Sequence, residues 1–142
     1  MRVVLPSPNG ATLSLAGVPC PVLAGCLRNA TAVARAAQAL GPRVSVIPAG
    51  EQWPNGSLRP CLEDWLGAGA IVDALAGELS SEAETARETF RWARKDLRRL
   101  LDGCTSGREL ADRGYSEDVR VAAALNVSSA VPALREGGFC AP

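Results

Sequence analysis

Polar residues follow three apolar runs of this sequence, at the points where each run ends. Asn9 and Gly10 follow the first run, Arg28 and Asn29 follow the second, and Glu51 follows the third. In an open parallel sheet, such turns lie together beyond the carboxyl ends of the strands, where ligands bind. Glycine turns and helix N-termini present backbone N–H groups that favour anions. The sequence therefore predicts an anion-binding rim formed by these three turns.

Carboxylates gather in the long polar loop that opens at the third turn. Glu51 begins this loop, Arg59 lies within it, and Glu63 and Asp64 close it. Carboxylates without histidine suit Mg2+, which takes one or two protein oxygens and leaves its other positions to water and substrate phosphate. Such an ion polarises a phosphoryl group and activates water. The pattern indicates metal ligands at Glu51, Glu63 and Asp64, with Glu51 and Asp64 as catalytic groups. Because acidic residues also favour a helix start, simple capping is the alternative for Glu63 and Asp64.

Two further features of the sequence add candidate residues to this site. Ser106 and Glu109 have the spacing of a capping box, in which each side chain accepts a hydrogen bond from the other residue's backbone N–H. That pairing leaves Arg108 as a candidate for anion binding. Trp53, in the polar loop, is either a lid over the site or the hydrophobic anchor of the loop.

Hydrophobic patterning predicts the elements that position these residues. The three apolar runs, at 2–5, 21–25 and 43–48, are typical of buried strands because Pro, Gly or Asn residues end each one. A helix is expected from Asn29 to Leu40, since apolar residues recur there at helical spacing. Strand, helix and strand in this order form a right-handed parallel unit. We therefore expect an α/β fold, a mostly parallel sheet with flanking helices in layers, as a single domain over 1–142.

Helices dominate the second half of the sequence. They are expected from residue 61 or 62 to about 79, over 80–103 with Ser80 or Ser81 as the N-cap, over 105–114, and from Ser116. The charged run 94–99 is typical of a solvated helix face. A last short strand is expected around 129–131.

Composition excludes several classes of function. Fifteen basic residues balance fifteen acidic ones, so net charge gives no support for binding to nucleic acid or to a membrane surface. The chain has no histidine, which excludes Ser-His-Asp hydrolases, histidine phosphatases and histidine-ligated zinc. Its five cysteines are scattered without a Cys-x-x-Cys pair, which is typical of reduced thiols in a cytoplasmic protein.

The segment Leu-Ala-Gly-Cys that ends at Cys26 matches a bacterial lipoprotein cleavage box, which gives an alternative interpretation. A signal peptide needs an uninterrupted apolar run, however, and Pro19 and Pro21 break the run before Cys26. We therefore expect Cys26 to be a small residue in a turn.

Five segments resemble the 2-phosphosulfolactate phosphatase family in their order and spacing, and most of all its actinobacterial branch. They are VVLPSPNG, AGCLRNATAVA, VIPAGEQWPNGSLRPCLEDWLGAGAI, SGRELADRGYSEDV and ALNVSSAVPAL. The resemblance implies an Mg2+-dependent α/β phosphatase of coenzyme M biosynthesis. Such an enzyme hydrolyses 2-phosphosulfolactate, a small anionic phosphoester, to sulfolactate and phosphate.

The resemblance also implies roles for residues of this chain. Substrate and phosphate binding would fall on Asn9, Gly10, Arg28, Asn29, Arg59, Ser106 and Arg108. The acidic loop residues of the family correspond to Glu51, Glu63 and Asp64, and further matches fall on Gly107, Leu110 and Asp118.

One departure from the family pattern leaves a second hypothesis open. Family members usually begin with a further N-terminal region that carries a strand and an Asp-containing motif, and this chain starts at what is normally a middle strand. The alternative to an enzyme is therefore a truncated, non-catalytic remnant that binds an anion or a partner subunit. A sheet edge left unpaired would favour self-association, so a homodimer is a further expectation.

Overall fold

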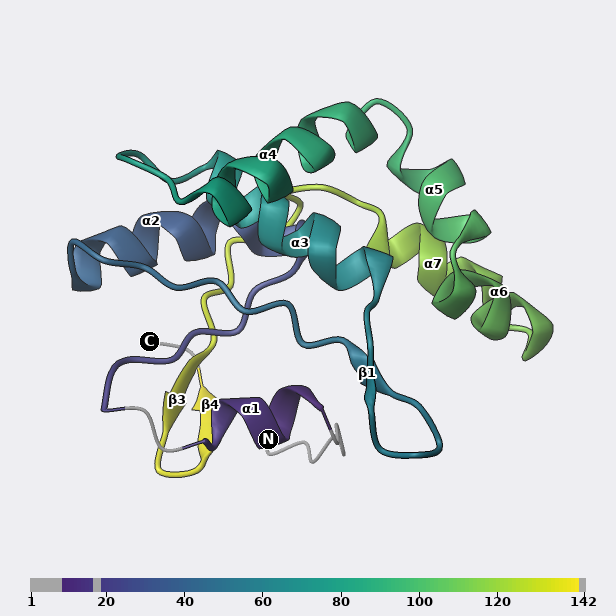
Figure 1. The fold of residues 1–142 in the computed structure, drawn as a ribbon, viewed down its shortest axis with the longest axis horizontal. Coiled ribbons are helices and arrows are strands. Elements are labelled where there is room, and N and C mark those ends of the chain that lie inside the picture. The colour runs from purple at the N-terminus through teal and green to yellow at the C-terminus, as the bar shows by residue number, and fades with distance from the viewer. Residues whose placement is uncertain (1–8, 17–18, 141–142) are drawn as a thin grey trace.

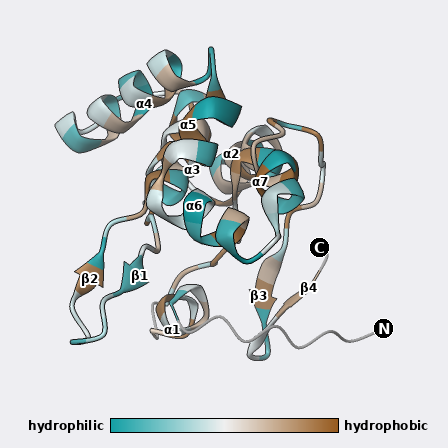
Figure 2. Cartoon of the chain, turned by 90° about the vertical axis from the view of Figure 1, so that its right-hand side faces the viewer, coloured by the Kyte–Doolittle hydropathy of each residue, from teal (hydrophilic) through white to brown (hydrophobic). Residues whose placement is uncertain are grey.

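Helices make up most of the computed structural model, which describes residues 9–16 and 19–140. The elements are α1 (Gly10–Ser14), the 3-10 turn η1 (Leu27–Asn29), α2 (Ala30–Leu40), β1 (Glu51–Gln52), β2 (Leu58–Arg59), α3 (Leu62–Asp73), α4 (Ser81–Ala93), α5 (Leu97–Gly103), α6 (Thr105–Asp112), α7 (Ser116–Ala122), β3 (Ala133–Arg135) and β4 (Gly138–Cys140). Helices α2 to α7 form one layer, and α1 and the two hairpins lie below it (Figure 1 and Figure 2).

Helix α3 is the centre of the helical layer. Every residue from Leu66 to Val72 is buried, and α2 and α4 both pack against this helix (Figure 1). Gly69 makes the close approach of α4 possible, because a Cβ atom there would overlap the carbonyl oxygen of Ala86. A helix surrounded by neighbours is buried on all sides, which explains why α3 shows no clear polar face.

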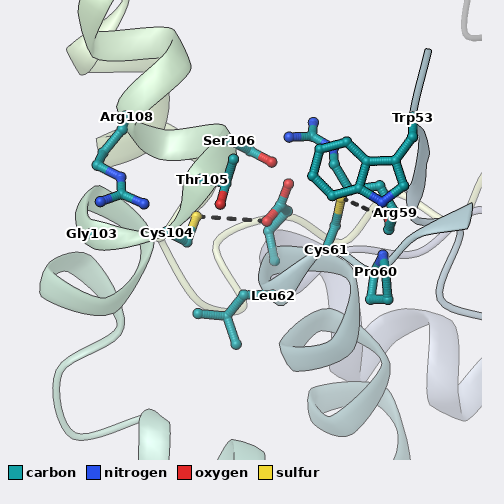
Figure 3. Close-up of a pocket in the computed structure, with 11 residues that line it drawn as sticks. Trp53, Arg59, Pro60, Cys61, Leu62, Gly103, Cys104, Thr105, Ser106 and Arg108 are labelled. Atoms are coloured by element: carbon teal, nitrogen blue, oxygen red, sulfur yellow. Dashed lines mark hydrogen bonds between the residues drawn. The ribbon is translucent and has the colours of Figure 1, made fainter.

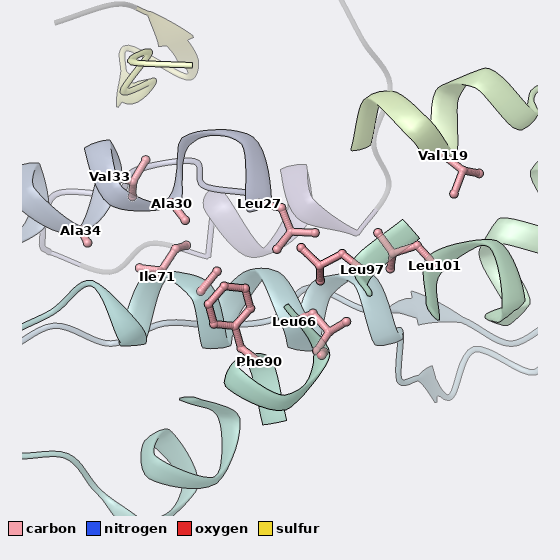
Figure 4. Packing of buried hydrophobic residues seen from close by; sticks show 12 residues of the cluster. Leu27, Ala30, Val33, Ala34, Leu66, Ile71, Phe90, Leu97, Leu101 and Val119 are labelled. Atoms are coloured by element: carbon pink, nitrogen blue, oxygen red, sulfur yellow. The ribbon is translucent and has the colours of Figure 1, made fainter. Parts of the chain in front are cut away.

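The hydrophobic core lies along the contacts of α3 with its neighbours. Leu27 and Val33 contribute from the α2 side, Phe90 from α4, and Leu66 and Ile71 from α3 itself (Figure 4). Leu97, Leu101 and Val119 extend the same cluster towards α5 and α7. Apolar residues recur at helical spacing over 80–103, and Ala86, Phe90, Ala93, Leu97 and Leu101 among them are buried, whereas Ala83 is half-buried.

The general α/β class agrees with the structure, but the strands of the described residues pair differently from the prediction. Strand β1 pairs with β2, and β3 with β4, both antiparallel. The run at 21–25 makes one antiparallel bridge, Leu23 to Ala133, flanked by backbone bonds to Pro132 and from Leu134. The run at 43–48 is not a regular strand, and the first predicted strand lies outside the described residues. A parallel sheet is therefore absent from residues 9–16 and 19–140. The physical reason is that a β-branched run becomes a strand only beside a neighbour that pairs its backbone.

Several predicted boundaries were wrong by a turn or more. The helix expected over 80–103 is two helices, which are separated at 94–96, although the charged run there is exposed as expected apart from Leu97 and Arg98. Ser80 is confirmed as N-cap, since its Oγ accepts a bond from the Ala83 N–H at 3.3 Å. Helix α3 ends at Asp73, six residues early, and the last strands begin at Ala133, after the predicted 129–131.

No helix within the described ranges combines the length and apolar character needed to cross a bilayer.

Candidate active site between the hairpin and helix α6

A pocket of about 300 Å3 opens between the β1–β2 hairpin, the start of α3 and the turn from α5 into α6. Trp53 and Arg59 form its hairpin wall, and Glu63 reaches it from α3. Thr105, Ser106 and Arg108 form the opposite wall, beside Cys104 (Figure 3). The pocket thus brings together Arg59, Glu63, Ser106 and Arg108 from the predicted site residues.

Arg59 is the most strongly held charge of the pocket. Its Nη1 and Nη2 atoms donate to Oε1 and Oε2 of Glu109 at 3.0 and 3.4 Å, and Glu51 Oε2 lies 3.5 Å from Nη2. Its guanidinium carbon lies 5.6 Å from the centre of the Trp53 ring, within the range of a cation–π contact. The hydrogen bond with Glu109 raises the pKa of Arg59, and the charges of Glu109 and Glu51 add to this shift, so Arg59 stays cationic.

The start of α3 brings two carboxylates with different partners. Glu63 lines the pocket, and its Oε2 lies 3.7 Å from the Cys104 sulfur. Asp64 Oδ2 accepts a 2.8 Å bond from the backbone N–H of Gly50. Burial raises the pKa of the Asp64 carboxyl, and the Gly50 bond opposes this shift. Asp64 therefore ties the base of the hairpin to α3.

Two pocket thiols stay protonated at neutral pH. Burial raises the pKa of both Cys61 and Cys104, and the charge of Glu63 adds to each shift. The Cys61 thiol donates to the Arg59 carbonyl oxygen at 3.5 Å. Because thiolates are the nucleophilic form, neither side chain is set up for covalent catalysis.

The predicted capping box of Ser106 and Glu109 is wrong. Cys104 is the N-cap, and its sulfur accepts a bond from the Gly107 N–H at 3.4 Å. Glu109 turns away from Ser106 and pairs with Arg59, which leaves Ser106 at the pocket wall. Gly107 is required in this turn, because a Cβ atom would overlap the carbonyl oxygen of Leu101.

The second predicted turn forms internal bonds, and its side chains do not line the pocket. Asn29 is buried; its Oδ1 accepts from the Cys26 N–H at 2.8 Å, and its Nδ2 donates to the carbonyl oxygens of Ala24 and Ala130. The Arg28 guanidinium donates to the Val121 carbonyl oxygen at 2.6 Å. Asn29 therefore fastens the loop before β3 to the start of α2, and Arg28 fastens α7.

The first predicted turn is the start of a helix. Asn9 is the N-cap of α1, without a side-chain cap bond, and Gly10 is the first residue of that helix. Neither belongs to the residues that line the pocket. The predicted rim of three turns is therefore not assembled in the described part of the chain.

The three predicted metal ligands point to three different partners: Glu51 to Arg59, Glu63 to Cys104, and Asp64 to Gly50. Within residues 9–16 and 19–140, no three acidic, Cys or His side chains converge as a metal cage. A magnesium ion does not need such a cage, because one carboxylate with water and substrate phosphate is sufficient. Glu63 is the carboxylate that lines the pocket and fits this role.

Sequence reasoning did not assign Cys61, Cys104 or Thr105 to this site, and it gave Glu109 a different partner. The scattered cysteines were interpreted as reduced thiols, and the capping-box spacing paired Glu109 with Ser106. Thr105 adjoins Ser106 and Cys104 lies two residues before it, and this closeness to a predicted site residue was the signal for a polar wall at the first turn of α6.

Known proteins resemble this chain over almost its whole length. Residues 1–137 match the family model described as 2-phosphosulpholactate phosphatase. The chain is 36% identical over 139 residues to a 2-phosphosulfolactate phosphatase of Methanothermobacter thermautotrophicus, and 33% identical over 140 residues to a probable 2-phosphosulfolactate phosphatase of Carboxydothermus hydrogenoformans. Each match covers 95% of this chain and 57% of the relative. The chain thus spans a little over half the length of these relatives, and the matched part includes every residue of the pocket.

Proposed function

Because the chain belongs to the 2-phosphosulfolactate phosphatase family, we propose that its pocket binds and hydrolyses a small anionic phosphate monoester. The observation that supports this most is the pocket wall of Thr105, Ser106 and Arg108, which faces the carboxylate of Glu63. Hydroxyls and a guanidinium group are good partners for phosphate oxygens. A neighbouring carboxylate can hold the cation that phosphate transfer requires.

The charges around the pocket favour Arg108 as the phosphate ligand. Arg59 shares its charge between Glu51 and Glu109, whereas Arg108 makes no ion pair within the described residues. Arg108 on α6 is therefore available to pair with an incoming phosphate. Arg59, predicted as a second phosphate ligand, is assigned to the pocket wall in this proposal.

Mg2+ is the proposed cofactor, held by Glu63 together with water and the substrate phosphate. A dianionic phosphate beside Glu63 would be repelled by that carboxylate, and a divalent cation held by Glu63 would offset the repulsion. When bound, the ion supplies polarisation of the phosphoryl group and activation of water.

Glu51 and Asp64 are proposed as supports for this chemistry. Neither lines the pocket, but Glu51 pairs with the wall residue Arg59, and Asp64 directly follows the wall residue Glu63. In this proposal, Glu51 or Asp64 takes the proton of the attacking water. Both residues also stabilise the hairpin, through the contacts of Glu51 with Arg59 and of Asp64 with the Gly50 N–H. Removing either carboxylate should therefore lower stability as well as activity.

The substrate proposed from the family is 2-phosphosulfolactate, and its products would be sulfolactate and phosphate. A role in coenzyme M biosynthesis and a cytoplasmic location belong to the same proposal. A phosphate, a sulfonate and a carboxylate on one small molecule would all be anionic, which again favours a site with Arg108 and a divalent cation.

We also propose that the run at 43–48 becomes a strand of a parallel sheet when a neighbour is present. Its residues Val44 and Ile47 are apolar and exposed, and an unpaired strand edge is a site of further pairing. A homodimer is one source of such a neighbour. Light scattering on the purified protein measures its mass and thereby tests for the homodimer.

The phosphatase proposal is tested by measuring phosphate released from 2-phosphosulfolactate, with Mg2+ and with a chelator. We expect release only with Mg2+, and a loss of at least about tenfold in Glu63→Gln. Glu117→Gln is the matched control, since Glu117 is an exposed carboxylate of α7 whose ion-pair partner is Arg120. Undiminished release in the chelator would contradict the metal. Binding of inorganic phosphate without any hydrolysis would favour the non-catalytic remnant.

A further inference from the structure

Arg59 links the hairpin to helix α6 through one buried guanidinium group. Its side chain is 9% exposed. Glu109 accepts from both terminal nitrogens, and Glu51 and the Trp53 ring also lie against the group. These contacts join β1, β2, the hairpin loop and α6 at a single point.

Of these three partners, Glu109 alone lies outside the hairpin. Glu51 stands directly opposite Arg59 in the β1–β2 pair, and Trp53 follows one residue after β1. Their contacts with Arg59 stiffen the hairpin but cannot hold it to another element. Glu109 comes fifty residues later in the chain, from α6.

We propose that Glu109 is a positioning residue, which fixes Arg59 and thereby holds the hairpin and Trp53 against the pocket. The proposal rests on the proposed function, because it assigns Glu109 to the closure of that same site. Glu109 itself is not a wall residue of the pocket and acts through Arg59.

The geometry separates this pair from the ion pairs on the helix surfaces. Exposed pairs contribute little, because water screens them and the side chains must be ordered. The Arg59–Glu109 pair is bidentate and one partner is buried, so removing Glu109 leaves a guanidinium that has lost its main partner. The pair Arg120–Glu117 is the contrast, since both side chains are mostly exposed.

The position of Trp53 supplies a test that does not depend on catalysis. In a chain with Trp65→Phe and Trp92→Phe, Trp53 is the one remaining tryptophan, and acrylamide quenching of its fluorescence reports its exposure. We expect Glu109→Gln to raise the quenching of Trp53, because the hairpin is released from α6. Glu109→Asp should lie between this variant and the parent, and Glu117→Gln should match the parent.

The activity readout is a split between kcat and KM in the chain with all its native tryptophans. Glu109→Gln should raise KM for the phosphoester roughly tenfold, as expected for the loss of a charge-assisted bond, while kcat stays near that of the parent. A general loss of structure would lower the urea midpoint and kcat together, and this outcome would overturn the proposal. Unchanged quenching in Glu109→Gln would overturn it too.

The two readouts separate the failure of this inference from the failure of the proposed function. If the parent chain releases no phosphate but Glu109→Gln still raises the quenching of Trp53, the phosphatase proposal fails and the positioning role stands. If the parent chain is active but KM and quenching are both unchanged in Glu109→Gln, the positioning role fails alone.

Discussion

The turn at Cys26 and the turn at Cys104 both place a cysteine in extended backbone immediately before a helical segment. Each is followed by an arginine and a small polar residue that the sequence marks for anion binding. In the first turn, Asn29 and Arg28 are bonded to backbone groups about a hundred residues further along the chain. In the second, Ser106 and Arg108 line a pocket.

This difference shows how a polar turn becomes structural or functional. A side chain whose donors and acceptors are all bonded inside the protein has none left for a ligand, as with Asn29. Arg108 lines the pocket and makes no ion pair within the described residues, so its guanidinium group is available to a ligand. The residue types in the two turns are similar, so the distinction depends on what packs against each turn.

The largest expected effect comes from Asn29→Ala, which should lower the free energy of unfolding by about 3 kcal/mol. The variant leaves the Cys26 N–H and the Ala24 and Ala130 carbonyl oxygens without their partner. Urea unfolding followed by circular dichroism measures the change. Gln38→Ala is the control, since Gln38 makes an exposed bond to Ala76 and its loss should cost below about 0.5 kcal/mol. Equal effects in the two variants would remove the structural assignment of Asn29.

Gly107→Ala tests the second turn and should cost about 2 kcal/mol or more, because its methyl group overlaps the Leu101 carbonyl oxygen. Gly103→Ala is the matched control: Gly103 lies just before the same turn, and a Cβ atom there meets nothing within 4 Å. Urea midpoints of both variants give the comparison. A Gly107→Ala protein as stable as Gly103→Ala would show that the turn is looser than described.

The smallest expected effect is the pH dependence of Asp64. Its folded-state pKa is raised by burial, so its stabilising contribution is full below the unfolded pKa and is lost as pH rises through the folded pKa. Asp64→Asn does not ionise, and its amide oxygen still accepts from Gly50. The stability of the parent should therefore fall relative to Asp64→Asn as pH rises above the ordinary aspartate value. Urea unfolding over this pH range measures the difference, and a parent that gains stability relative to the variant would contradict the raised pKa.

Local patterns predicted the helices better than the sheets or the site. Ala86, Phe90 and Leu97 recur at helical spacing, and Ser80 caps its own helix, so these features follow from neighbours in the sequence. Strand pairing depends on partners far along the chain, and the run at 43–48 finds no ladder partner within the described residues. Helical periodicity alone did not reveal the break at 94–96.

The candidate site was predicted in part for the same reason. Arg59, Glu63, Ser106 and Arg108 were identified by residue type and do meet in one pocket. Glu109 was assigned to Ser106 because that partner is three residues away, whereas the structure pairs it with an arginine fifty residues earlier. Asn29 was assigned to phosphate because its bonds to Ala24 and Ala130 cannot be inferred from spacing.

The most direct measurement compares Arg108→Ala with Arg28→Ala in one assay of phosphate release from 2-phosphosulfolactate. Arg108→Ala should lower kcat/KM roughly 100-fold, as expected when a charge-assisted contact to phosphate is lost. Arg28→Ala removes a bond to the Val121 carbonyl oxygen and should leave kcat/KM within about twofold of the parent. A loss of activity in Arg28→Ala with Arg108→Ala unchanged would contradict the assignment of the site to the turn at Cys104.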